Sequence, residues 1–312
     1  MRYREIGKTS LVVSDIGFGT WPLSGDSHGS LAYGKTDDTE SIAALQLAYR
    51  CGINFFDTAD LYGYGHVENL LSKALGSVRD KIIIASKVGM INNDSDTDLS
   101  TLHIFESING SLKRLNTDYL DLYLLHSPKI EQITDEVINT LQSLKKAGKI
   151  RYYGLSTKAV ADGFPAVEKF KFDVIETNYS IMDNRCDKNG LLDLCAKTFT
   201  GVIARTPLSQ GIITGEFTYN NDSTDRRNSI PRETYDRLTS AYSEIVNSMK
   251  DKFTTKAQTA LRFCLSHPAV SSVIPGMKTR TEVMENCYAS EFGPLSSDEL
   301  NSIKNICKMY SL

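Results

Sequence analysis

The 312-residue sequence predicts an α/β fold, a (β/α)8 TIM barrel with an N-terminal β-hairpin plug at one end and a long loop after its seventh strand. Short apolar segments of strand length alternate with amphipathic segments of helix length, and eight such units can be counted. Several strand segments are apolar throughout, as in KIIIAS (81–86), which is typical of parallel strands covered by helices. No linker composition divides the chain, so residues 1–312 are expected to form a single domain.

The predicted elements follow one another along the whole chain. Residues 1–13 hold two short strand-like segments around Gly7-Lys8-Thr9-Ser10 and predict the hairpin. The barrel strands are expected at 16–19, 54–56, 82–86, 120–125, 152–156, 174–177, 202–205 and 270–274. The helices between them are expected at 38–49, 66–75, 100–115, 134–147, 158–169, 190–197 and 254–266. The polar stretch 207–231 predicts the long loop, and residues 232–252 predict an additional helix.

The composition is that of an ordinary globular chain and argues against several classes of function. Lys and Arg number 35 and Asp and Glu 38, so the net charge is −3 and no basic excess exists for nucleic acid or an anionic membrane. No apolar run reaches the ~20 residues that span a bilayer, and the N-terminus lacks the apolar stretch of a signal peptide. The six cysteines show no CxxC pair and no zinc-ligand spacing, which predicts reduced thiols, no metal site and a cytoplasmic protein.

Three glycine-rich motifs match nucleotide-binding patterns only in part. GSLAYGKT (29–36) fits the P-loop pattern, but no strand precedes it and the acidic residues Asp37, Asp38 and Glu40 follow it. Acidic residues there are better explained as favourable charge at a helix N-terminus. GYGHVE (63–68) and GFGTWP (17–22) lack the third glycine of a dinucleotide fingerprint. A nucleotide cofactor is therefore expected to bind by some other fold than the Rossmann fold.

The C-terminal ends of the predicted strands supply one set of polar residues, and in a (β/α)8 barrel these ends carry the active site. The second strand ends at Asp57, and the loop after it carries Tyr62. The third strand ends at Lys87 and the fourth at His126. Taken singly, each residue has an ordinary structural explanation, such as a turn or a surface aromatic. Their convergence from three adjacent strands onto one pocket predicts an active site.

These residue types suit proton transfer to or from an oxygen atom. A free tyrosine has a pKa of about 10, and an adjacent ammonium group lowers that pKa, so Lys87 is expected to activate Tyr62. Asp57 is expected to pair with Lys87, and His126 to orient a carbonyl oxygen or relay a proton. A tyrosine acid beside a carbonyl predicts carbonyl reduction. The hydride must then come from a bound cofactor, because no side chain supplies one.

At this point the chain resembles the aldo-keto reductases over essentially its whole length. The matching blocks, in order, are YREIGKTSLVVSDIGFGTW, NFFDTADLYGYGHVENLL, IIIASKVG, DYLDLYLLHSP and SSVIPGMKTRTEVMEN. The family is a (β/α)8 barrel that binds a nicotinamide cofactor in an extended pose without a Rossmann fold. The resemblance implies the catalytic tetrad Asp57, Tyr62, Lys87 and His126, with Tyr62 as the proton donor.

The resemblance also implies which residues contact the cofactor, here NADPH. From the nicotinamide end to the adenine end they are Gly19, Thr20, Trp21, Ser156, Leu208, Ser209, Gln210, Gly211, Gly276, Lys278, Thr279, Arg280, Glu285 and Asn286. Lys278 and Arg280 stand at an expected helix start, where cations are unfavourable unless an anion binds there. They are therefore expected to meet the adenosine phosphate and to favour NADPH over NADH.

Three positions depart from the family pattern at the nicotinamide end. Thr157 stands where many members have Asn, Glu176 where many have Gln, and Arg205 where many stack a tyrosine on the nicotinamide. Glu176 and Arg205 end adjacent predicted strands, so the sequence allows an ion pair between them. A guanidinium plane can also stack on a ring as a tyrosine does. Both residues are counted among the predicted cofactor contacts.

The loop 207–231 is predicted to be a clamp that orders when cofactor crosses the barrel mouth, because its polar composition gives it little apolar surface of its own. Its charged residues are candidates for a latch: Asp222, Asp225, Arg226 and Arg227. The substrate is expected to be a small carbonyl compound. The candidates for its pocket mix aromatic and polar groups and admit a sugar-like or an aromatic compound: Trp21, Ser24, Asp26, Tyr64 and Met90.

Several functions remain open at this stage. The first is an NADPH-dependent reductase, and the same residues would serve a sugar or alcohol dehydrogenase running in the oxidative direction. A Schiff-base aldolase with Lys87 as the nucleophile would use the same barrel. A non-enzymatic nicotinamide-binding regulatory subunit would keep the tetrad intact, and a P-loop NTPase is the weakest alternative. The sequence leaves the oligomeric state open.

Overall fold

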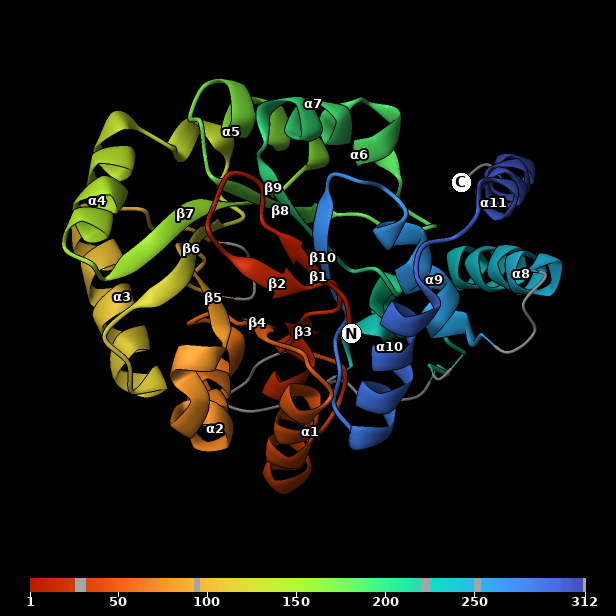
Figure 1. The fold of residues 1–312 in the computed structure, drawn as a ribbon, viewed down its shortest axis with the longest axis horizontal. Helices are drawn as coiled ribbons and strands as arrows, with labels where there is room; N and C mark the ends of the chain where they lie inside the picture. The colour runs from red at the N-terminus through yellow and green to blue at the C-terminus, as the bar shows by residue number, and fades with distance from the viewer. Residues whose placement is uncertain (26–31, 93–95, 216, 220–224, 250–253, 311–312) are drawn as a thin grey trace.

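Eight parallel strands form a barrel in the computed structural model, which describes residues 1–25, 32–92, 96–215, 217–219, 225–249 and 254–310 (Figure 1). The strands are β3 (Phe18–Gly19), β4 (Phe55–Asp57), β5 (Ile83–Val88), β6 (Leu120–His126), β7 (Ile150–Ser156), β8 (Val174–Asn178), β9 (Gly201–Arg205) and β10 (Val270–Ile274). Each strand pairs with the next one in the chain. Parallel bridges from Ile16 to Val273 and from Gly19 to Gly276 join the first strand to the last. The predicted (β/α)8 barrel is confirmed.

Helices surround the strands on the outside of the barrel (Figure 1). They are α1 (Asp38–Arg50), α2 (His66–Leu75), α3 (Thr101–Leu115), α4 (Asp135–Lys146), α5 (Gly163–Glu168), α6 (Arg185–Lys188), α7 (Leu191–Thr198), α8 (Arg232–Ser248), α9 (Lys256–Leu265), α10 (Arg280–Phe292) and α11 (Ser297–Met309). Several begin at a residue whose side chain accepts a hydrogen bond from the first turn, as sequence preferences for helix starts predict. Asp37 does so for α1, accepting from the backbone of Glu40. The acidic run after the P-loop-like motif is therefore a helix start.

The N-terminal hairpin covers one end of the barrel. Strands β1 (Tyr3–Glu5) and β2 (Val12–Ser14) pair in antiparallel fashion. The side chains of Ile6, Leu11 and Val13 are buried in one cluster with inward-facing residues of the barrel strands. The turn comes so close to the start of β9 that a Cβ atom on Gly7 would lie 2.3 Å from the backbone nitrogen of Gly201. The predicted hairpin plug is confirmed, and the active site is left to the opposite end.

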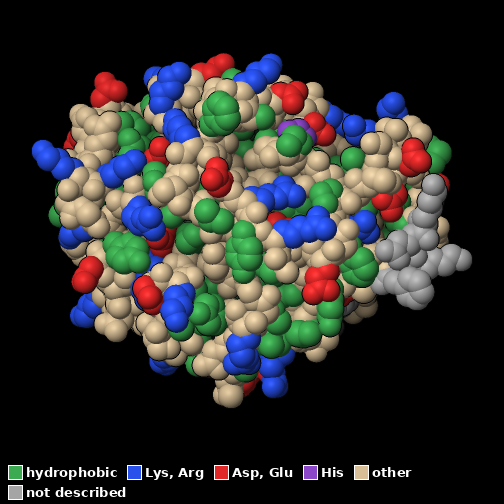
Figure 2. Space-filling view, viewed as in Figure 1, with side chains coloured by type: hydrophobic (Ala, Val, Ile, Leu, Met, Phe, Trp, Pro, Cys, Tyr) green, Lys and Arg blue, Asp and Glu red, His purple; other side chains and the backbone are tan. Residues whose placement is uncertain are grey.

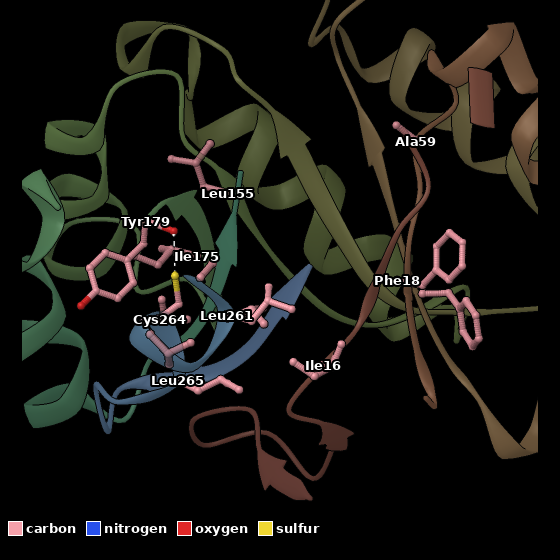
Figure 3. Close-up of a cluster of buried hydrophobic side chains, with 14 of the residues drawn as sticks. Ile16, Phe18, Ala59, Leu155, Ile175, Tyr179, Leu261, Cys264 and Leu265 are labelled. Atoms are coloured by element: carbon pink, nitrogen blue, oxygen red, sulfur yellow. Dashed lines mark hydrogen bonds between the residues drawn. The ribbon is translucent and has the colours of Figure 1, made fainter. Parts of the chain in front are cut away.

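The larger apolar core lies between the strands and the surrounding helices (Figure 3). Ile16, Ile175 and Leu261 belong to it, and the thiol of Cys264 donates to the backbone oxygen of Tyr179 at 3.2 Å. All six cysteines are free thiols. On the face shown in Figure 2, acidic and basic side chains are interspersed over the surface.

The element boundaries follow the sequence closely where strands are buried on both faces. Most predicted strand limits agree to within two residues. The helix predicted at 158–169 is divided instead into a 3₁₀ turn at Val160–Asp162 and the short helix α5. The additional helix predicted at 232–252 is present as α8, and residues 250–253 lie outside the described part. Helices α6 and α11 come from segments for which no helix was predicted, and α10 begins at the helix start expected at Lys278 and Arg280.

Candidate active site

A cavity of about 500 Å³ opens at the C-terminal ends of the barrel strands. Its floor contains residues from the ends of β4, β6 and β8, among them Asp57, His126 and Glu176. Its far end reaches residues at and after the end of β10, including Lys278 and Asn286. The cavity therefore lies at the end of the barrel where such folds carry their active sites.

The four residues predicted from strand ends meet at the floor of this cavity. The ammonium of Lys87 donates to both carboxylate oxygens of Asp57, at 2.6 and 2.7 Å, and to the backbone oxygen of Thr58 at 3.1 Å. Its Nζ also lies 3.2 Å from the hydroxyl of Tyr62. Lys87 is fully buried, and Asp57 and Tyr62 are 2% and 7% exposed. The expected pair between Asp57 and Lys87 is present, and the tyrosine hydroxyl is in hydrogen-bond contact with the same ammonium.

Local backbone geometry holds Tyr62 in this position. It starts a 3₁₀ helix, Tyr62–Gly65, in which Gly63 and Tyr64 have positive φ angles of 57° and 50°. This left-handed stretch turns the chain directly after Tyr62, and glycine is the residue that adopts it without strain. The indole of Trp21 packs edge-on against the Tyr62 ring with the centroids 4.9 Å apart. The tyrosine ring is thus held between Trp21 and Lys87.

His126 ends β6 on the other side of the tyrosine. Its ring lies edge-on to the ring of Tyr62, with centroids 5.8 Å apart. Burial lowers the pKa of His126 well below its usual value, and the charges of Lys87 and Arg205 lower it further. The imidazole is therefore neutral near pH 7. Its Nδ1 is buried and has no hydrogen-bond partner among the described residues, so the ring has capacity left for a ligand.

The electrostatics correct one expectation about the tyrosine. Burial raises the pKa of Tyr62, and although the Lys87 ammonium opposes this, the carboxylates of Asp57 and Glu176 add to the increase. The net effect is a pKa above the usual value, whereas the sequence-based argument considered only the lowering by Lys87. Tyr62 is accordingly a protonated hydroxyl at neutral pH. In this state it is an acid that can donate a proton and a poor base.

Glu176 and Arg205 do not form the ion pair that the sequence allowed. Register is the reason, because Glu176 pairs with Ile203 across β8 and β9, while Asn178 pairs with Arg205. Arg205 donates instead to the backbone oxygen of Thr157 at 2.9 Å. Glu176 turns toward Lys87, with Oε2 3.4 Å from Nζ.

Most of the predicted cofactor residues line the cavity, namely Gly19, Trp21, Glu176, Arg205, Leu208, Gln210, Gly211, Gly276, Lys278, Glu285 and Asn286. Others bond elsewhere and do not line it. Thr20 donates to the backbone oxygen of Asp57, and Ser156 donates to Glu176. Ser209 lies 3.4 Å from the hydroxyl of Ser180.

The two remaining predicted residues lie at the start of α10 and also stay outside the lining of the cavity. Thr279 accepts from the backbone of Glu282 and caps the helix. Arg280 forms an ion pair with Glu40 of α1 at 2.9 Å, and its side chain is 61% exposed. The predicted phosphate contact of Arg280 would therefore have to replace this partner. Lys278 lines the cavity, where its ammonium donates to the backbone oxygen of Tyr33 at 2.9 Å.

Some lining residues were missed by the sequence argument. Asn178 ends β8, so the strand-end rule would have found it. Tyr33 lines the cavity from the P-loop-like motif at 29–36, for which the sequence predicts no role at this site. Among the predicted substrate contacts, Trp21 and Met90 line the cavity and Ser24 and Tyr64 do not. Asp26 lies outside the described residues.

The described part of the long loop reaches across to the loop after β3. Asp225 forms an isolated antiparallel bridge with Tyr33, and the backbone of Arg226 donates to Ala32. Arg227 forms an ion pair with Asp225 at 2.6 Å and lies over the ring of Tyr33. Three of the four predicted latch residues therefore contact one another or residues 32–33. The fourth, Asp222, lies outside the described residues, and the mobility of the loop stays a prediction.

Among the described residues, no group of three or more His, Cys, Asp or Glu side chains is arranged to hold a metal ion. None of the helices in the described part is long and apolar enough to cross a membrane.

The barrel, its hairpin plug and the tyrosine at the floor of the cavity define an oxidoreductase that acts on carbonyl or alcohol groups. A model of the aldo/keto reductase family matches residues 15–308, and the chain belongs to this family. Members of the family use NADH or NADPH.

Individual relatives agree with this assignment. The chain is 31% identical to the uncharacterized oxidoreductase YqkF of Bacillus subtilis, over 99% of this chain and 97% of that protein. It is 30% identical to L-galactose dehydrogenase of Arabidopsis thaliana, over 95% and 90% of the two chains. The solved structure of the aldo-keto reductase AKR11C1 from Bacillus halodurans in its holo form superposes with a TM-score of 0.82 at 30% identity, covering 98% of this chain and 96% of that one.

Proposed function

We propose that this protein reduces an aldehyde or ketone to the alcohol with NADPH and that Tyr62 is the proton donor. The observation that carries the proposal is the contact between the Tyr62 hydroxyl and the Lys87 ammonium at 3.2 Å, on the floor of the cavity. A neutral phenol held beside an ammonium group can give up its proton to a carbonyl oxygen. The resulting tyrosinate is then stabilised by that cation.

The remaining tetrad residues support this proton transfer. A carbonyl oxygen that accepts from Tyr62 also lies within reach of His126, which borders the same ring. The neutral imidazole can donate a hydrogen bond to that oxygen and hold it in place. Asp57 keeps Lys87 charged and oriented through its two short contacts. A bound NADPH would supply the hydride, which no side chain can provide.

The cavity has the donors and acceptors that an extended dinucleotide needs. Two polar atoms of its lining residues, Nδ1 of His126 and Nε of Arg205, are buried and have no hydrogen-bond partner among the described residues. Such atoms at the nicotinamide end suit a polar ligand group. Further along, Arg226 and Arg227 line the cavity and place positive charge where a diphosphate would lie, and Lys278 adds a cation beyond β10 for the additional phosphate of NADPH. Lys278 is the residue on which the proposal of NADPH rests most directly.

The environment of Lys87 argues against the aldolase. A Schiff-base lysine must be available as a neutral amine. Burial alone would lower the pKa of Lys87, but the carboxylates of Asp57 and Glu176 outweigh burial and raise that pKa. The ammonium is therefore retained, and Lys87 is not available as a nucleophile.

The oxidative direction is the second candidate, because one relative is L-galactose dehydrogenase. The same Tyr62 would then take a proton from an alcohol. A screen that follows nicotinamide absorbance with aldehydes, ketones, sugars and alcohols, in both directions and with both cofactors, tests the proposal. We expect carbonyl reduction with NADPH at neutral pH to be the fastest reaction. Turnover with alcohols alone would favour the dehydrogenase, and absence of turnover with every compound would favour a regulatory nicotinamide-binding protein.

A further inference from the structure

Two carboxylates share one ammonium on the floor of the cavity. Asp57 contacts Lys87 at 2.6 Å, and Glu176 lies 3.4 Å from the same Nζ. The three residues are 2%, 2% and 0% exposed, so water does not screen their charges. Glu176 comes from β8, two strands beyond the strand of His126, and many family members have an uncharged Gln at this position.

The charges of this group do not balance if both carboxyls are ionised. Asp57 and Glu176 would then carry two negative charges against the single positive charge of Lys87. Neighbouring carboxylates in a desolvated site do not both ionise readily, and one of them retains a proton. Both carboxyl groups approach the same Nζ, Asp57 at 2.6 Å and Glu176 at 3.4 Å, and the negative charge of Glu176 raises the pKa of Asp57.

The other groups around the pair do not remove the imbalance. His126 on β6 is neutral, and Tyr62 is a neutral phenol. Arg205 on β9 is the second cation nearby, but it donates to the backbone oxygen of Thr157 and forms no ion pair with Glu176. Ser156 on β7 donates to Oε1 of Glu176 at 3.0 Å, which leaves Oε2 without a hydrogen-bond partner in the described residues.

We propose that Asp57 and Glu176 hold one proton between them at neutral pH and that this proton reloads Tyr62 through Lys87 after each reduction. The inference rests on the proposed function, and it makes Glu176 a positioning residue that acts through Lys87. Burial and the neighbouring Glu176 raise the pKa of Asp57 well above its usual value, in agreement with a retained proton.

The transfer balances without any further reactant. When Tyr62 has given its proton to the carbonyl oxygen, Nζ of Lys87 gives a proton to the phenolate oxygen 3.2 Å away. The lysine then takes the proton of the carboxyl pair, whose nearest oxygen is 2.6 Å from Nζ. One O–H bond of the pair is broken and one O–H bond of Tyr62 is formed. Lys87 ends as it began, and the pair recovers its proton from solvent when the product leaves.

Infrared spectroscopy of the protein without cofactor tests the stored proton directly. A protonated carboxyl has a carbonyl stretch that a carboxylate lacks. At about pH 7.5 we expect the wild-type spectrum to contain such a band and the spectrum of Glu176→Gln to lack it, because the remaining carboxylate of Asp57 then balances Lys87. No such band in the wild-type protein at this pH would overturn the proposal. This measurement needs no turnover, so it stands even if the proposed reaction is not found.

A matched control separates this pair from another buried carboxyl. Burial raises the pKa of Asp60 to about 6, and its carboxylate accepts from Ser107 outside the tetrad. Asp60→Asn should leave the infrared band at about pH 7.5 in place. Loss of the band in this variant rather than in Glu176→Gln would assign the proton to Asp60 and contradict the proposal.

The pH dependence of turnover tests the role of the proton. Once the pair ionises, we expect kcat for reduction by the wild-type enzyme to fall with a slope of one proton, about tenfold per pH unit. Glu176→Gln has no second carboxyl to ionise and should lack this decrease, whereas Asp60→Asn should retain it. Identical profiles for wild type and Glu176→Gln, normalised to their maxima, would show that the pair takes no part in turnover.

Discussion

The two ends of the cavity hold their charges in different ways. At the floor, the ammonium of Lys87 is fully buried, and its polar contacts within the described part of the chain come from the tetrad, Thr58 and Glu176. At the far end, Arg280 is 61% exposed on its side chain and has found a partner, Glu40, on another helix. A buried charge must be neutralised by the groups that contact it directly. An exposed charge can interact with several nearby surface groups or with water. The charge pairs at the floor are therefore fixed, whereas the charged side chains at the far end can exchange partners.

This difference predicts a graded series of effects along the cavity. Substitutions at the floor should disturb both stability and chemistry, because they leave charges unmatched in a site without water. Substitutions at the far end should change cofactor affinity alone.

The largest effect on stability is expected from Lys87→Met. Removing one partner of a buried ion pair typically costs about 3–5 kcal/mol, and here two carboxyls lose their cation. Unfolding in urea, compared with wild type, measures the loss. Without the ammonium, the carboxyl pKa values in the folded state lie above those in the unfolded chain, so the variant should regain stability as the pH falls from 7 to 5. A loss of stability that did not change with pH would contradict the account of buried, unmatched carboxylates.

Lys278→Ala tests the far end and should weaken NADPH binding by about tenfold or more. A charge-assisted hydrogen bond to phosphate is worth about 1.5–3 kcal/mol, and tenfold corresponds to about 1.4 kcal/mol. Titration of NADPH and NADH against the protein measures both affinities. If Lys278 meets the additional phosphate, NADH binding should change much less. Equal losses of affinity for NADPH and NADH would show that Lys278 is not the cause of an NADPH preference.

Arg280→Ala should have a smaller effect, about twofold or less on NADPH affinity, because Glu40 already neutralises the guanidinium. Glu40→Gln is the complementary variant. It frees Arg280 and should tighten NADPH binding relative to NADH. A loss of NADPH affinity in Arg280→Ala as large as that in Lys278→Ala would mean that the cofactor displaces Glu40 from Arg280.

The smallest structural change is expected in the loop 207–231. Its described residues are joined to residues 32–33 by the Asp225–Tyr33 bridge and by Arg227. Bound NADPH should add contacts and slow amide hydrogen exchange in the loop. Equal exchange with and without NADPH would make this segment a surface insertion instead of a clamp.

The sequence predicts the residues at the floor of the cavity better than the contacts at the far end, because the floor is buried and the far end is exposed. Asp57 and His126 end buried strands and Lys87 stands one residue before the end of another, and strand order alone brings such residues together. The separation of Glu176 from Arg205 depends on the register between β8 and β9, which hydrophobic pattern does not specify to one residue. The partner of Arg280 lies 240 positions away in the chain, and no sequence pattern connects it with Glu40.

The central claim is that Tyr62 donates the proton, and single-turnover reduction by Tyr62→Phe tests it most directly. The substitution removes the hydroxyl and keeps the ring that packs against Trp21. General acid catalysis contributes about 10²- to 10⁴-fold, so the rate of the chemical step should fall by that factor while NADPH affinity stays within about twofold of wild type. A chemical step close to the wild-type rate, with cofactor saturating, would contradict the account and assign the proton to another group.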